Sequence, residues 1–239
     1  MKLFKTVLCA AAASLAMGGV ASAAEWSFNA GAATDYVFRG IDQSGPWYDE
    51  NQIFGGADVT FGMDNAFYAG SWVSNTGTQY DNGVEYDLYT GWKSKLGGAN
   101  IDLGLIFYGY NNSEEGDVSD NSNTFEVKAA ASIPAGSWTY GGAVYYSNDY
   151  AGSNEASTYV EANLAYTLKS GPTLSAAVGN FSSDCCSGSV GSYSTFNFGV
   201  TVPVTEKVSL DARYIGVTDD ASHFGSKFDG FVATVKATF

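Results

Sequence analysis

Residues 84–110 read VEYDLYTGWKSKL, GG, ANIDLGLIFYGY, and this stretch decides the fold class. Apolar and polar side chains alternate on both sides of the Gly97-Gly98 pair, with Leu88 on one parity and Asp87 on the other. Period-two alternation predicts β-strands with two different faces, and two such runs joined by two glycines predict a hairpin. Each run is long enough to cross a bilayer at a tilt. The stretch therefore predicts two long antiparallel strands.

The same alternation continues outward from this hairpin in both directions, and helical periodicity is hard to find after residue 25. The chain is therefore all-β, with about twelve strands, an even number as in bacterial outer-membrane barrels. The predicted strands are 25–39, 51–62, 66–75, 84–96, 99–110, 124–134, 137–148, 156–169, 172–181, 193–204, 207–217 and 229–239.

The connections between these strands alternate in length. Those after every second strand are tight, such as Gly97-Gly98 and Ser170-Gly171, whereas the others are long and polar, such as 111–123 and 182–192. Transmembrane up-and-down barrels have short periplasmic turns and longer external loops. The pattern therefore predicts a transmembrane antiparallel β-barrel with both termini in the periplasm.

Sixteen charged residues within the predicted strands share one parity. They lie opposite the apolar parity, as expected if the apolar face meets lipid, where one Lys or Arg near the midplane costs about 2–4 kcal/mol. Three are Lys95, Lys169 and Lys207. The other thirteen are our candidates for lining a pore: Asp35, Arg39, Asp58, Glu85, Asp87, Lys93, Asp102, Glu126, Lys128, Glu161, Asp211, Arg213 and Lys236.

Aromatic residues on the apolar parity gather near both ends of the strands. Trp26 and Phe239 are expected at the periplasmic ends, and Tyr36 and Phe38 at the external ends, with small or aliphatic residues between the two groups. Rings with a polar edge prefer the two membrane interfaces. The arrangement favours a membrane barrel over a soluble exported β-sandwich.

The first 23 residues are expected to be a secretory signal peptide. Lys2 and Lys5 precede an apolar run, and Ala21-Ser22-Ala23 has the small-x-small pattern of a cleavage site. The mature barrel would be 24–239, with a net charge of about −16 in place of −14. Such acidity argues against nucleic-acid partners.

Several short stretches resemble a known family. Residues 35–44, DYVFRGIDQS, resemble the opening of the TorF family of porins, and 67–72, 84–91 and 145–150 agree in type and order. The resemblance weakens around 111–123 and 182–192. It implies an outer-membrane barrel with a pore role.

The sequence offers little support for chemistry, so we expect neither an enzyme nor a cofactor. The one histidine, His223, lies beside Ser222, but a Ser, a His and an Asp within five residues do not build a hydrolase site. The adjacent Cys185 and Cys186 could form only a strained bridge. An acidic cluster in 114–120 lacks the regular calcium-loop spacing, so no metal is assigned.

These observations predict an outer-membrane porin for small hydrophilic solutes, with a narrow and weakly charge-selective lumen. Asp35 and Arg39 are our first candidates for setting its conductance. The expected partners are outer-membrane lipid, lipopolysaccharide and, because the chain closes on Phe239, the barrel-assembly machinery. The main alternative is a closed structural or surface-binding barrel, and a barrel hydrolase is a weaker one.

Overall fold

The computed structural model describes residues 24–44, 51–62, 65–77, 83–111, 123–183, 191–217 and 226–239. Every regular element in these ranges is a β-strand, and none contains a helix long and apolar enough to span a membrane. The strands are β1 (Glu25–Ala33), β2 (Val37–Phe38), β3 (Ile41–Asp42), β4 (Gln52–Phe61), β5 (Asn65–Asn75), β6 (Val84–Leu96), β7 (Ala99–Asn111), β8 (Thr124–Ala135), β9 (Trp138–Ser147), β10 (Ser157–Thr167), β11 (Thr173–Ser183), β12 (Gly191–Pro203), β13 (Val208–Val217), β14 (Ser226–Lys227) and β15 (Gly230–Thr238).

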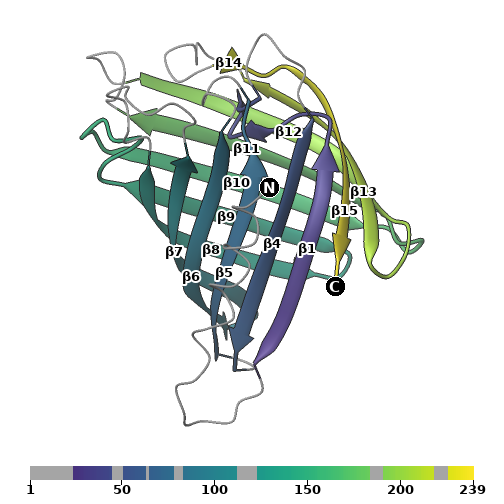
Figure 1. The fold of residues 1–239 in the computed structure, drawn as a ribbon. Coiled ribbons are helices and arrows are strands. Elements are labelled where there is room, and N and C mark those ends of the chain that lie inside the picture. Colours follow the sequence, from purple (N-terminus) through teal and green to yellow (C-terminus); the bar gives the residue numbers. More distant parts are fainter. Residues whose placement is uncertain are drawn as a thin grey trace, which may run out of the picture.

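Twelve of these strands form a closed antiparallel barrel, as the sequence predicts (Figure 1). Each pairs with its neighbours along the chain, and β1 closes the ring between β4 and β15, with Ala30 opposite both Gly55 and Ala237. Closure leaves no sheet edge with unpaired backbone groups. The remaining strands form a small sheet in the order β14-β3-β2.

The two ends of the barrel differ in their connections. One end, here named the turn end, carries the tight turns, the first residues of β1 and the last residues of β15. Gly97 and Gly98 both have positive φ (58° and 88°), which two-residue hairpins require and which glycine adopts without steric cost. The opposite end, here named the loop end, carries the longer connections.

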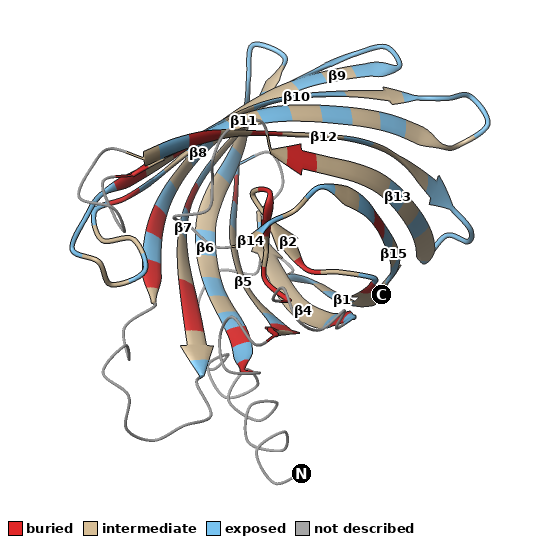
Figure 2. Ribbon diagram, turned by 90° about the horizontal axis from the view of Figure 1, so that it is seen from above, coloured by how far each residue is buried: buried red, intermediate tan, exposed pale blue. Residues whose placement is uncertain are grey.

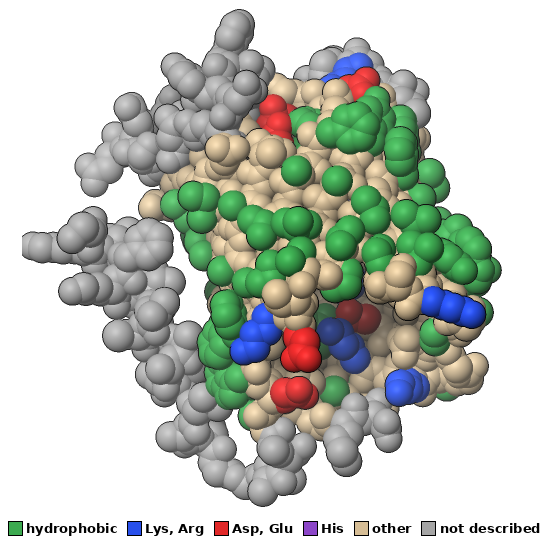
Figure 3. Space-filling view, turned by 90° about the vertical axis from the view of Figure 1, so that its right-hand side faces the viewer, with side chains coloured by type: hydrophobic (Ala, Val, Ile, Leu, Met, Phe, Trp, Pro, Cys, Tyr) green, Lys and Arg blue, Asp and Glu red, His purple; other side chains and the backbone are tan. Residues whose placement is uncertain are grey.

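The barrel wall has an apolar outer face and a polar inner face. Because side chains alternate along a strand, the β6–β7 hairpin turns Leu88 and its partner Phe107 outward, and Asp87 and its partner Tyr108 inward. Large exposed hydrophobic side chains come from all twelve barrel strands. Apolar side chains cover the middle of the surface in Figure 3, and charged ones lie toward its two ends.

One predicted strand is wrong at its end. The sequence predicts a strand over 25–39 with Tyr36 and Phe38 facing outward, but β1 ends at Ala33 and residues 34–44 turn into the barrel. Figure 2 shows β2 inside the ring of barrel strands. The alternation persists past Ala33, but Arg39 and Gly40 have positive φ (50° and 81°), a conformation that no barrel strand continues through. We name residues 34–44 the inward segment.

Candidate functional site

The inward segment is fastened to the barrel wall by a buried ion pair. Arg39 donates from Nη1 and Nη2 to the two carboxylate oxygens of Glu126 on β8, both at 2.7 Å. Their side chains are only 6% and 1% exposed. Burial alone would lower the pKa of Arg39, but the paired bonds to Glu126 outweigh it and raise that pKa. Arg39 therefore stays charged in spite of its burial.

Aromatic rings surround this ion pair. The guanidinium carbon of Arg39 lies 4.6 Å from the ring centre of Phe38, 4.8 Å from that of Tyr145 and 4.5 Å from that of Tyr159. Tyr108 donates a further hydrogen bond of 3.2 Å to Glu126. Cation–π contacts gain in strength where water is excluded. The rings therefore add to the attachment that the ion pair provides.

A second attachment lies three residues earlier in the chain, at Tyr36. The hydroxyl of Tyr36 donates to both carboxylate oxygens of Glu85 on β6 at 2.9 Å, and Glu85 is 1% exposed. Ser44 closes the segment on itself, because its hydroxyl donates to Asp35 at 2.9 Å and accepts the backbone N–H of Tyr36 at 3.1 Å. Burial raises the pKa of Asp35 to about 6.

Apolar packing and backbone bonds complete the attachment. Ile41 packs against Tyr159, Phe181 and Tyr193 in a buried cluster. Its strand β3 also pairs with β14, a short strand that follows β13 in the chain. The inward segment is therefore held both by the barrel wall and by β14. Residues 34–44 thus lie inside the loop end of the lumen and contact its wall on several strands.

Substitution of Gly40 tests whether close packing of this residue against the barrel wall holds the inward segment in place. Gly40→Ala places a Cβ 2.8 Å from Val217 and 2.9 Å from Thr195, at a φ that costs an L-residue about 1–2 kcal/mol. We expect the segment to loosen and trypsin to cleave after Arg39. Gly97→Ala is the matched control, because its φ is also positive but its Cβ would meet nothing within 4 Å. Equal resistance of the two variants to trypsin would contradict this role of the packing at Gly40.

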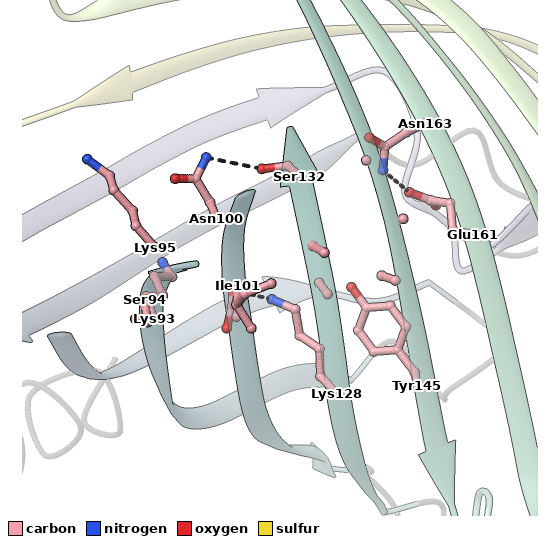
Figure 4. A pocket seen from close by; sticks show the side chains of 16 residues that line it. Lys93, Ser94, Lys95, Asn100, Ile101, Lys128, Ser132, Tyr145, Glu161 and Asn163 are labelled. Carbon is pink, nitrogen blue, oxygen red and sulfur yellow. Dashed lines mark hydrogen bonds and ion pairs between the residues drawn. The ribbon is translucent and has the colours of Figure 1, made fainter. Parts of the chain in front are cut away.

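The turn end of the lumen holds a cavity of about 470 Å³. Its charged lining residues are Lys93, Lys95, Asp102, Lys128 and Glu161, all of them on strands β6, β7, β8 and β10. Figure 4 shows several of these side chains around the cavity, and Figure 3 shows a hollow near the lower edge with acidic and basic side chains in it. The cavity is therefore open to water and charged.

The remaining candidates from the sequence lie along the inner wall. Asp58 accepts a hydrogen bond of 2.6 Å from Tyr89. Arg213 pairs with Asp211 at 3.1 Å, and both side chains are about a quarter exposed. Asp87 has one buried carboxylate oxygen without a hydrogen-bond partner in the described chain. Lys236 lies between Gly31 and Ser209 on β15.

The structure thus groups the thirteen candidates into two sets. Asp35, Arg39, Glu85, Asp87 and Glu126 gather at the loop end, where acids outnumber bases, and most of the lysines lie in the other half. Arg39, Glu85 and Glu126 fasten the inward segment, so their side chains are buried rather than free in the lumen. Tyrosines on the inward parity were missed, although their parity is readable in the sequence.

Some sequence features lie outside the described residues: Cys185, Cys186, the acidic cluster in 114–120, Ser222 and His223. Within the described ranges no group of three His, Cys, Asp or Glu side chains could hold a metal ion.

The fold and the lumen place this chain in the class of porin-like β-barrels. Residues 17–239 match the model of a family described as bacterial proteins of unknown function (Gcw_chp), and the chain belongs to this family. No curated protein sequence matches it. The narrower resemblance to TorF porins stays a prediction.

Solved structures with the same fold are outer-membrane channels. The KdgM porin superposes with a TM-score of 0.57 at 9% identity, over 89% of this chain and 98% of its own. The NanC porin gives 0.57 at 11%, over 90% and 99%. An outer membrane channel from Pseudomonas putida F1 gives 0.56 at 11%, over 94% and 97%. At such identities the likeness establishes the fold.

Proposed function

We propose that this chain is an outer-membrane pore through which small hydrophilic solutes diffuse passively. One observation carries the proposal: each of the twelve barrel strands presents a large apolar side chain to the outside, while the charges face inward. A water-facing surface would have no reason to be apolar all round, because exposed patches larger than a few hundred Å² are rare on soluble monomers. The exposed residues, one from each strand, are Phe28, Ile53, Phe67, Leu88, Leu103, Val127, Val144, Val160, Val178, Phe198, Leu210 and Val235.

The location follows from the same proposal. A signal peptide of residues 1–23 exports the chain, and residues 24–239 insert into the outer membrane with both termini in the periplasm. The turn end then faces the periplasm, and the loop end faces outward. Partners of such a barrel are the assembly machinery, outer-membrane lipid and lipopolysaccharide.

The lumen supports a narrow pore with weak charge selectivity. Its wall carries both signs, and three ion pairs neutralise part of that charge. The inward segment narrows the loop end, and the open cavity at the turn end holds water. Twelve strands enclose an interior wider than the side-chain-filled eight-strand case and smaller than a general porin.

A closed structural or surface-binding barrel is the second candidate, and the inward segment favours it. Phe181 and Tyr193 are almost fully buried beneath Ile41, so this part of the lumen is packed like a protein core. A plug of this kind could close the lumen completely. A hydrolase would rest on Ser222 and His223, which lie outside the described residues.

Single-channel recording of the refolded mature chain in planar bilayers separates the first two functions. We expect discrete conductance steps, with reversal potentials in a KCl gradient that indicate weak selectivity. Proteoliposomes should swell in small sugars and not in larger ones. Absence of both steps and swelling, from protein whose unheated gel mobility shows a folded barrel, would establish the closed barrel instead.

A further inference from the structure

One carboxylate in the turn-end cavity already has a partner at each oxygen. Asp102 accepts a hydrogen bond of 2.8 Å from Tyr68 at one oxygen and an ion pair of 2.8 Å from Lys128 at the other. Lys93 lies directly opposite Asp102 in the strand register, yet its Nζ lies 4.5 Å from the ring centre of Tyr68. Lys93 therefore contacts the ring of Tyr68 and forms no ion pair with Asp102.

The second carboxylate in the cavity is used in the same way. Glu161 accepts a bond of 3.1 Å from Tyr159 at one oxygen and of 3.2 Å from Asn163 at the other (Figure 4). Among the described residues, neither Lys93 nor Lys95 forms an ion pair. The cavity lining thus holds three lysines against two acids, and Lys128 alone of the three lysines is in an ion pair.

The two lysines are placed to act together. Lys93 and Lys95 alternate with outward residues on β6, so both lie on the lumen side about 7 Å apart along the strand. Next to them, Asn100 and Ser132 offer neutral polar groups, joined by a hydrogen bond of 3.4 Å (Figure 4). Ammonium groups bind oxyanions through charge-assisted hydrogen bonds, and amides and hydroxyls bind hydroxyl groups.

From this arrangement we propose that the turn-end cavity is a binding site for a small hydroxylated carboxylate, with the ammonium groups of Lys93 and Lys95 binding its carboxylate. Asn100 and Ser132 face its hydroxyl groups. The inference deepens the proposed pore, since it assigns a solute class to one part of its lumen. It also makes the two ends of the lumen unlike: the loop end favours cations and the turn end retains anions.

The test is equilibrium binding of gluconate to the detergent-solubilised full chain, measured by isothermal titration calorimetry. Sorbitol is the neutral probe of matched size, because it lacks the carboxylate. Lys93→Gln/Lys95→Gln removes the proposed charges. Lys169→Gln/Lys207→Gln is the matched control, since it removes the same charge from exposed turns outside the cavity. Because the variant removes both charge-assisted contacts to the carboxylate, we expect at least a tenfold loss of gluconate affinity in the first variant.

The outcomes are distinct. Binding of gluconate, weak or absent binding of sorbitol, and loss in the cavity variant alone support the site. Equal affinity for sorbitol, equal affinity of the two variants, or no gluconate binding by the unmodified chain overturns it. None of these results depends on conduction. If the chain conducts KCl but binds no gluconate, the binding site is disproved and the pore stands. If it binds gluconate but shows no conductance steps, the pore is disproved and the binding site stands.

Discussion

Replacing Arg39 with glutamine is expected to lower the free energy of unfolding by about 3–5 kcal/mol, because Glu126 would stay buried without its counter-charge. The local consequence is easier to detect. Without the paired bonds, the inward segment can leave the wall, so the single-channel conductance should rise. Urea unfolding in detergent measures the first effect, and planar-bilayer recording measures the second.

Three further variants separate this ion pair from general damage. Arg39→Lys keeps the charge but not the planar fork, so its effect should be intermediate. The double variant Arg39→Gln/Glu126→Gln removes both charges and should recover much of the lost stability. Lys128→Gln breaks a pair whose side chains are 20% and 22% exposed, and it should cost only about 1 kcal/mol. Equal losses in Arg39→Gln and Lys128→Gln would contradict the role of burial.

The barrel could be predicted from the sequence because its determinants are local. Alternation within a strand and a glycine pair at Gly97-Gly98 specify a hairpin without knowledge of the rest of the chain. Ten further strands follow by the same pattern, each paired with its neighbour in sequence. In the barrel wall, the pairing of β1 with β15 joins strands that are distant in sequence and closes the ring. The alternation pattern does not specify this pairing, and the prediction of the strands does not require it.

The inward segment could not be predicted, because its contacts are distant in sequence. Arg39 meets Glu126 across 87 residues, and Tyr36 meets Glu85 across 49. The alternation of residues 35–39 fits a continuing strand equally well, which is why Tyr36 was placed on the outer face. Two observations marked this stretch in the sequence: the inward parity of Asp35 and Arg39, and the resemblance of residues 35–44 to a family opening.

The sequence also could not tell which charges pair. Parity puts Lys93, Lys128 and Asp102 on the inner face, but it does not show that Asp102 binds Lys128 and leaves Lys93 over a tyrosine ring. The choice depends on side-chain length and on the depth of each group along the lumen. The sixteen charges on the inward parity are eight acids and eight bases, whereas the structure gathers an excess of acids at the loop end and most of the lysines in the other half.

Two neighbouring alanines offer the sharpest test of the membrane. Ala129 and Ala130 are consecutive on β8, so they lie at almost the same depth and face opposite sides. Ala129 faces outward, opposite the exposed Leu103 and Val144. Ala130 lines the turn-end cavity. A pair of arginine substitutions therefore differs in the face alone.

We expect Ala129→Arg to lower the free energy of unfolding from lipid vesicles by about 2–4 kcal/mol, because its guanidinium group would lie in hydrocarbon. Ala130→Arg should cost far less, since its side chain enters a water-filled cavity beside Asp102, and it should instead shift the reversal potential toward anions. Urea titration of vesicle-folded protein measures both stabilities. If the outer face met water, the difference would disappear: Ala129→Arg would be nearly neutral and would cost no more than Ala130→Arg. Because the two variants share composition, charge and depth, a difference between them reports the surroundings of the outer face directly, which neither conductance nor gel mobility does.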